Sequence, residues 1–293
     1  MRISVVIVSI ATFAEIVFAS PRLINGRPAD PSKFKASVWT RSCSATVVGP
    51  EVVFIAAHCV EQNKNISFTA GANQYSASCK ISSDYFGNNT ADYALCVTNR
   101  KVDGIPYEKV NMDPNRLRVG DEVLLTGYGC VRPGGGGGND GTYRIGESRI
   151  SRMPSGSNND IVTQTGAALC FGDSGGPAFH YDSSGNRVVI STNSRGNIST
   201  TSYLSATHTR DGREFFEQWA NETGKRICGL HSDAPGCLGD TDPGPGPQPN
   251  SEFTLDYPIA VVKVSIKKDF EKFLLNLRTS LIRAINEVDY PDF

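Results

Sequence analysis

Short apolar runs of strand length follow one another between residues 23 and 209, separated by Gly, Pro, Asn, Asp and Ser. The clearest of them are residues 45–48, 52–57, 94–97, 122–126 and 187–191. Such runs between turn-forming residues are typical of antiparallel sandwiches and barrels. No helical pattern of comparable strength interrupts them, so a parallel sheet with crossover helices is disfavoured. The pattern predicts an all-β domain.

The C-terminal part of the chain departs from this pattern. Phe215, Phe216 and Trp219 lie on one side of residues 211–223, which predicts a short amphipathic helix. Residues 238–252 are rich in Pro and Gly and predict a linker. Residues 253–293 form a small extension, in which residues 259–266 are compatible with a strand and the apolar positions of residues 268–288 recur at helical spacing. This stripe needs a covering surface on the domain, on a partner or on another copy, and the sequence leaves the role of the extension open.

Five consecutive glycines occupy residues 134–138, inside a segment from 131 to 141 that offers few side chains for packing. The segment predicts a mobile surface loop. A phosphate-binding loop is disfavoured, because neither a Lys-Ser or Lys-Thr pair nor a helical pattern accompanies the glycines.

The first nineteen residues have the order of a secretory signal peptide. Arg2 gives a positive start, residues 3–14 are almost continuously apolar, and Val17 and Ala19 are the small residues expected before a cleavage site. The apolar run is too short to span a bilayer. We therefore expect residues 1–19 to be removed and the mature protein to be secreted, or periplasmic in a bacterium.

Composition and charge narrow the range of partners. The apolar content of 39% is enough for a core, and the formal net charge is −1. A strongly basic balance would be needed to attract nucleic acid or an anionic membrane, so neither is expected. No later segment is long and apolar enough to span a membrane.

An even number of cysteines follows the predicted signal peptide, which indicates disulfides formed in an oxidising compartment. The eight are Cys43, Cys59, Cys79, Cys96, Cys130, Cys170, Cys228 and Cys237. Zinc is disfavoured because the sequence contains no Cys-x-x-Cys pair and its four histidines are scattered. We expect neither a metal nor a cofactor.

Three segments carry the residue types that amide hydrolysis needs. His58 follows an apolar run, Asp92 opens another, and Ser174 lies in the small-residue segment Gly-Asp-Ser-Gly-Gly-Pro. Hydrolysis needs a nucleophile, a base to take its proton and a carboxylate to orient that base. Gly172 leaves room for its own backbone N–H and that of Ser174 to point at a developing oxyanion.

The three motifs, in the order His, Asp, Ser, resemble those of the trypsin/chymotrypsin family over residues 23–224. The resemblance implies a domain over residues 23–237 with two antiparallel Greek-key β-barrels and a C-terminal helix, and the triad His58, Asp92 and Ser174 in the cleft between the barrels. Asp84 is the nearest rival carboxylate, but the Ala-Leu that follows Asp92-Tyr93 is absent there.

Leu23-Ile24-Asn25-Gly26, preceded by Arg22, resembles the mature N-terminus of the family. Cleavage after Arg22 would remove residues 20–22 as a short propeptide, and the new ammonium of Leu23 would form a buried ion pair with Asp173. The other interpretation is a plain signal-peptide junction. A second protease is expected to perform this cleavage, because Ala168 stands where trypsin-like enzymes carry the Asp needed for cleavage after Arg.

Cys43–Cys59 matches the bridge that the family has behind its catalytic histidine. The other three pairings rest on weaker grounds. Two join cysteines that are close in the sequence, and the last joins the two cysteines that then remain. The expected bridges are Cys43–Cys59, Cys79–Cys96, Cys130–Cys170 and Cys228–Cys237.

The same resemblance implies a specificity pocket formed by Ala168, Ser191 and Asn193. Ala168 stands where trypsin-like enzymes carry the Asp that binds Lys or Arg, so an uncharged or apolar substrate side chain is expected. Asn193 is expected to narrow the pocket.

Two functions are compatible with these residues. The first is a secreted serine endopeptidase acting on proteins or peptides. The second is a catalytically silent binding or adhesion module that acts through the extension. All residues of the implied machinery are present, which favours the enzyme.

Overall fold

The computed structural model describes residues 23–62 and 64–239 of the 293-residue chain. The predicted signal peptide, the propeptide and the C-terminal extension lie outside the described residues, as does all but the start of the linker. None of the helices in the described part is long and apolar enough to cross a membrane.

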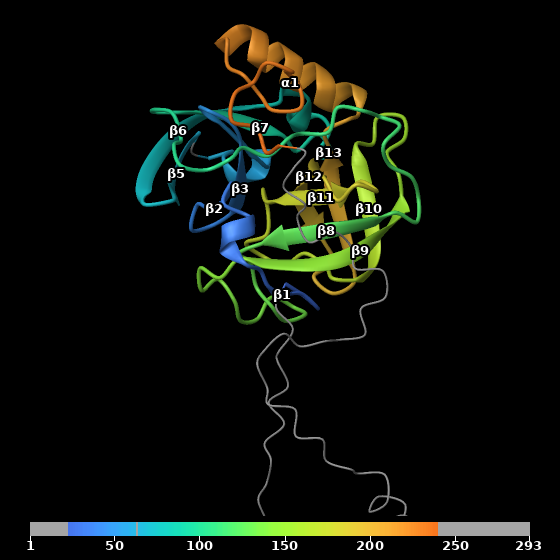
Figure 1. Cartoon of the computed structure of the whole chain (residues 1–293). Coiled ribbons are helices and arrows are strands. Elements are labelled where there is room, and N and C mark those ends of the chain that lie inside the picture. Colours follow the sequence, from blue (N-terminus) through green and yellow to red (C-terminus); the bar gives the residue numbers. More distant parts are fainter. Residues whose placement is uncertain (1–22, 63, 240–293) are drawn as a thin grey trace, which may run out of the picture. The chain divides into compact units, whose positions relative to one another are not determined.

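Six antiparallel strands form the first barrel, drawn in blue and teal in Figure 1. They are β2 (Ser37–Trp39), β3 (Ser44–Gly49), β4 (Val52–Ile55), β5 (Asn65–Ala70), β6 (Asn73–Ile81) and β7 (Ala94–Thr98). Their order in the sheet is β2-β3-β4-β7-β6-β5. Every second residue of β5 is buried, so one face of this strand turns to the barrel core and the other to solvent.

The second barrel, green to yellow in Figure 1, repeats this topology. Its strands are β8 (Glu122–Gly127), β9 (Arg144–Arg152), β10 (Asp160–Gly166), β11 (Pro177–Tyr181), β12 (Arg187–Gly196) and β13 (Thr201–Ala206). The third strand pairs with the sixth in both barrels, and β8 closes the second ring by pairing with both β9 and β11. The short β1 (Arg27–Pro28) pairs with β9. The expected all-β, two-barrel fold is confirmed.

One α-helix, α1 (Arg210–Thr223), follows the second barrel as predicted. Thr209 caps its start, because the side-chain oxygen accepts the N–H of Gly212, and Gly224 ends it in the left-handed conformation. Phe216 and Trp219 of α1 share one core cluster with apolar side chains of β4, β7, β11 and β12. The helix therefore covers an apolar core to which both barrels contribute.

The glycine-rich segment lies at the surface, as the sequence predicts, and its backbone contacts neighbouring loops, while its mobility stays a prediction. The N–H of Gly134 donates to the carbonyl of Ile198, and that of Gly135 donates to the carbonyl of Arg132. A Cβ at Gly135 would lie 2.8 Å from the ring of Phe171. The absence of side chains lets the backbone fit closely against the neighbouring loops, so these glycines pack through the main chain.

The structure contains four disulfides, and no described cysteine is free. They join Cys43 to Cys59, Cys79 to Cys96, Cys130 to Cys170, and Cys228 to Cys237. The bridge from Cys130 to Cys170 ties the start of the glycine-rich segment to the loop that carries Ser174.

Candidate active site

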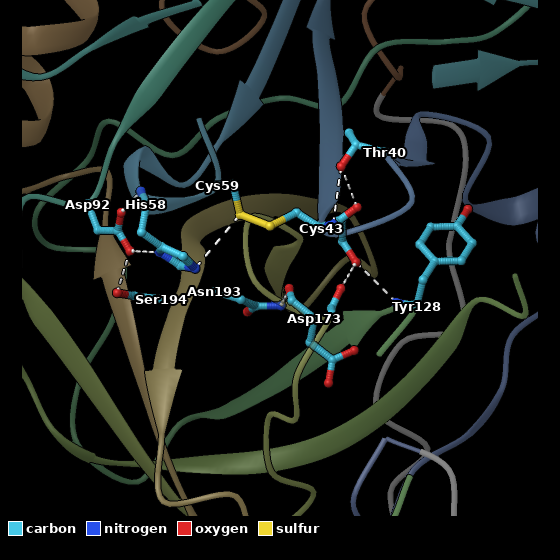
Figure 2. Close-up of a disulfide and its surroundings, with 11 residues drawn as sticks. Thr40, Cys43, His58, Cys59, Asp92, Tyr128, Asp173, Asn193 and Ser194 are labelled. Atoms are coloured by element: carbon cyan, nitrogen blue, oxygen red, sulfur yellow. Dashed lines mark hydrogen bonds and ion pairs between the residues drawn. A yellow bond between two sulfur atoms is a disulfide. The ribbon is translucent and has the colours of Figure 1, made fainter. Parts of the chain in front are cut away.

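His58 lies on the 3₁₀ helix η2 (Ala57–Cys59), directly after the fully buried strand β4. Its Nδ1 donates to Asp92 Oδ2 at 2.7 Å, and its backbone N–H donates to Asp92 Oδ1 at 2.9 Å. The disulfide to Cys43 holds η2 from the other side, and His58 Nε2 lies 3.8 Å from Cys59 Sγ (Figure 2). Because Nδ1 carries the proton in this arrangement, Nε2 is the nitrogen that can accept one.

Asp92 is placed by its neighbours on both barrels. It stands two residues before β7, and its side chain is 2% exposed. The hydroxyl of the adjacent Tyr93 donates to the carbonyl of Ala206 at 2.7 Å, which anchors this segment to the second barrel. A third donor reaches the carboxylate, because Ser194 Oγ donates to Asp92 Oδ2 at 2.6 Å (Figure 2). Three donors fix the direction of this carboxylate.

Ser174 lies in the loop between β10 and β11, whose backbone is held from behind. The N–H of Gly175 donates to the carbonyl of Asn193 at 2.8 Å. The side-chain amide of Asn193 donates to the carbonyls of Thr126 and Asp173. The carbonyl of Ser174 accepts the N–H of Ser44 at 2.8 Å. Both barrels therefore position the loop that carries the nucleophile candidate.

Two backbone donors remain available at this loop. Within the part of the chain that the structure describes, the N–H groups of Gly172 and Ser174 donate to no protein acceptor. Gly172 has a φ of +98°, and a Cβ there would lie 2.9 Å from the Cα of Gly129. Glycine is therefore required at position 172. Donors of this kind stabilise an oxyanion when they converge on the reacting oxygen.

His58, Asp92 and Ser174 line one cleft of about 420 Å³. Ser174 Oγ and His58 Nε2 are not hydrogen-bonded to each other in the structure, and such contacts often tighten only when substrate is bound. The other walls of the cleft come from both barrels. They are Tyr85, Asn89, Leu169, Cys170, Phe171, Ser194, Arg195, Gly196 and Ile198.

The predicted pocket residues do not line this cleft, and the prediction is corrected. Ala168, Ser191 and Asn193 are fully buried. Ala168 pairs with Ile24, Ser191 pairs within the sheet, and Asn193 supports the loop of Ser174 from behind. Asn193 therefore does not narrow a pocket.

The prediction was displaced by three residues, because Ser191 rather than Ser194 was matched to the strand that borders the cleft. The cleft is lined by Ser194, Arg195 and Gly196, and the register between β12 and β13 shifts between Asn193 and Arg195, which marks a β-bulge there. Gly196, two residues after a serine, is the sequence signal that could have found this alignment. Ser194 and Arg195 were missed for the same reason.

Asp173 directly precedes Ser174 in the same loop. It is fully buried and accepts two backbone hydrogen bonds, from the N–H of Gly129 at 2.8 Å and from that of Cys170 at 2.9 Å. A Cβ at Gly127 or Gly129 would collide with it. In this uncleaved chain Leu23 carries a peptide bond, so the expected ion pair with Asp173 has no ammonium to form it. The side chain of Leu23 is already fully buried in the core of the second barrel.

Comparison with known proteins identifies the family. The family model described as Trypsin matches residues 23–208, which is more than half of the chain. The chain belongs to the trypsin family. It is 26% identical over 199 residues to a trypsin-like protease of Streptomyces glaucescens, an alignment that covers 59% of this chain and 72% of that protein.

Solved structures support the fold of this trypsin-family chain. A mutant of human heparin binding protein has a TM-score of 0.57 at 15% identity and covers 70% of this chain and 100% of its own. A structure of HBP at atomic resolution has a TM-score of 0.53 at 15% identity, covering 68% and 96% respectively. At the level of the family the chain is grouped with serine proteases, which are hydrolases with protein substrates.

The described part of this trypsin-family chain offers one group of side chains with metal-ligand spacing, Cys43, His58 and Cys59. The two sulfur atoms are bonded to each other in a disulfide. They are therefore not available as thiolates, the form in which cysteine binds a metal.

Asp173 makes the stability of the uncleaved protein depend on pH. Burial raises the pKa of its carboxyl from 3.8 to about 7, against the opposing effect of the Cys170 and Gly129 amides. Between these values the unfolded chain has released a proton that the folded chain still holds, so the free energy of unfolding falls as pH rises from about 4 to about 7. We expect Asp173→Asn to remove this slope in denaturant titrations of the uncleaved protein. An unchanged slope in that variant would contradict the assignment.

Proposed function

We propose that this chain is a secreted serine endopeptidase, and that Ser174, His58 and Asp92 form its catalytic triad. The observation that carries the proposal is the buried Asp92 carboxylate. It holds Nδ1 of His58 at 2.7 Å and so leaves Nε2 as the base on the cleft that Ser174 also lines. This is the arrangement that activates a serine hydroxyl.

The proposed reaction follows from these positions. His58 Nε2 takes the proton of Ser174 as its oxygen attacks the substrate carbonyl, and Asp92 stabilises the imidazolium that forms. The N–H groups of Gly172 and Ser174, which have no protein acceptor in the described chain, stabilise the oxyanion. The imidazolium then protonates the leaving amine, and water releases the acyl group from Ser174 by the reverse sequence.

Activation by cleavage after Arg22 is part of the proposal. Asp173 is a fully buried carboxyl group with no cation bonded to it among the described residues. Its ionised form is strongly destabilising unless it is paired. Leu23 is buried in the same barrel, and the N–H of Ala168 in the loop before Ser174 already donates to the carbonyl of Ile24 at 2.9 Å. A new ammonium at Leu23 would supply the missing cation and order the loop.

The test is covalent labelling with a serine-reactive fluorophosphonate after cleavage at Arg22. We expect the cleaved wild type to be labelled, the uncleaved protein to be labelled far more slowly, and Ser174→Ala not to be labelled. Ser184→Ala is the matched control, because Ser184 lies in the exposed turn between β11 and β12 and does not line the cleft. A cleaved, folded wild type that resists labelling would favour the second function, a binding module on a protease fold.

The cleft predicts a preference for uncharged substrate side chains. Leu169, Cys170, Phe171 and Ile198 make much of its wall apolar, and Arg195 adds a cation that opposes Lys or Arg. Among the described residues that line the cleft, Asp92 is the one carboxylate, and its oxygens are occupied by three donors. We expect kcat/KM for reporter peptides with Arg at the cleavage site to be at least about 100-fold below that for apolar ones. Faster cleavage of the Arg reporters would contradict this prediction.

A further inference from the structure

Arg195 extends from the proposed triad to a second buried carboxylate. Its Nη1 donates to Ser194 Oγ at 3.3 Å, and its Nη2 forms an ion pair with Asp160 Oδ2. Ser194 Oγ in turn donates to Asp92 Oδ2 at 2.6 Å. A continuous path of charged and hydroxyl groups therefore runs from Asp160 through Arg195 and Ser194 to Asp92, and ends at His58.

The geometry restricts how Ser194 can act. A hydroxyl has one proton to donate, and Arg195 has only donors. Since Arg195 donates to Ser194 Oγ, the hydroxyl proton is directed at Asp92. This holds the hydroxyl in one rotamer and places its oxygen between a cation and an anion.

Three strands of the second barrel hold Arg195 in this position. Asp160 opens β10 and its side chain is 1% exposed, whereas that of Arg195 on β12 is 36% exposed. The guanidinium lies 5.0 Å from the ring centre of Tyr203 on β13, and Nη1 also reaches the carbonyl of Asn89 at 3.4 Å. A buried carboxylate left without its cation is strongly destabilising, so Asp160 keeps Arg195 in the wall of the cleft.

We propose that Arg195 and Asp160 are positioning residues that act on His58 through Ser194 and Asp92. The proposal rests on the proposed function, because it assigns a role to side chains that support the same triad. The cation of Arg195 disfavours the imidazolium of His58, and the anion of Asp160 favours it. Together Arg195 and Asp160 hold Ser194 in place, and their opposite charges offset each other in their effect on His58.

The test is the pKa of the His58 imidazole, measured by NMR titration in a Ser174→Ala background. The sequence has only four histidines, and His58→Gln identifies the relevant signal. We expect Arg195→Gln to raise this pKa by about half a unit, and Asp160→Asn to lower it by about half a unit. Arg195→Lys keeps the cation and should leave the pKa near its original value.

The other titratable groups near these residues do not produce the same opposite shifts in the pKa of His58. Burial raises the pKa of Tyr85 and of Tyr93, so both stay neutral through the titration. Asp173 titrates near the same range, but it is identical in every variant and cancels in the differences. Arg149→Gln is the matched control, since it removes a surface ion pair with Glu122 from the same barrel and should not shift the pKa.

Opposite shifts in Arg195→Gln and Asp160→Asn support the proposal, because lost packing alone cannot change sign with the charge removed. Shifts of the same sign, no shift in either variant, or an equal shift in Arg149→Gln overturn it. If Arg195→Gln does not fold, the lowered pKa of Asp160→Asn decides, because this change leaves a part-exposed cation and no buried charge. If the cleaved wild type is not labelled by the fluorophosphonate, the proposed function fails. The NMR titration needs no catalytic activity, so it tests only the effect of Arg195 and Asp160 on the pKa of His58.

Discussion

Asp92→Asn is expected to lower kcat of the cleaved protein about 10⁴-fold and to leave the fold intact. Two of the three donors converge on Oδ2, namely Nδ1 of His58 and the hydroxyl of Ser194, while Oδ1 accepts the backbone N–H of His58. The Asn side chain has one acceptor oxygen where the carboxylate has two, so it cannot accept all three hydrogen bonds. If its NH₂ group faces His58, Nδ1 must become the acceptor and Nε2 must carry the proton. The imidazole then has no free nitrogen with which to deprotonate Ser174.

The measurement is steady-state hydrolysis of an apolar reporter peptide, together with thermal unfolding to verify the fold. Asp84→Asn is the matched control, because Asp84 is an exposed carboxylate on the neighbouring 3₁₀ helix η3 (Ser83–Phe86) and is the rival in the sequence. We expect it to retain wild-type kcat. A large loss in Asp84→Asn together with little loss in Asp92→Asn would refute the assignment of the triad.

Asp173→Asn is expected to lower kcat/KM of the cleaved protein about 100- to 1000-fold, which corresponds to the loss of a buried ion pair. Asp173 precedes Ser174 directly, and its carbonyl accepts both the N–H of Gly176 and the side-chain amide of Asn193. The neutral amide that replaces the carboxylate no longer attracts the ammonium of Leu23. The loop with the two oxyanion donors then loses the contact that orders it, although the disulfides and barrel cores remain.

Hydrolysis and fluorophosphonate labelling of the cleaved variant measure this effect, and circular dichroism verifies the fold. Asp103→Asn serves as the control, since Asp103 is an exposed carboxylate whose ion pair within the described residues is with Lys101. It should behave like the wild type. Full activity of a folded Asp173→Asn protein would exclude activation through this pair and leave the signal-peptide junction as the meaning of the Arg22-Leu23 sequence.

Strands of continuous apolar sequence were predictable, whereas strands of mixed sequence were not. β4 and β7 have apolar runs buried on nearly every residue, so their positions follow from hydrophobicity alone. β9 (Arg144–Arg152) contains three arginines and a glutamate, and its pattern resembles a surface loop. It forms a strand because β8 and β10 supply hydrogen-bond partners on both sides. Partners from distant parts of the chain therefore decide where such strands form.

The contacts of the glycine-rich segment were not predictable for a related reason. Glycine content alone predicts mobility, because a flexible backbone loses much entropy on ordering. Here Gly135 lies close to the ring of Phe171, and the N–H of Gly134 donates to the carbonyl of Ile198. Both contacts are possible because glycine has no side chain to fill the space between the loops. Whether glycines permit motion or permit contact depends on what lies against them, and the local sequence does not contain that information.

The sequence by itself determined the chemical groups of the proposed site, because a nucleophilic serine loop, a base and a carboxylate each have a local motif around Ser174, His58 and Asp92. Only the tertiary structure decided which side chains surround them. The bulge in β12 turns Ser194 to Asp92 and brings Arg195 to the cleft, while Asn193 is buried behind the loop. A shift in strand register exchanges the two faces of a strand, and register is set by pairing with distant strands rather than by neighbours in sequence.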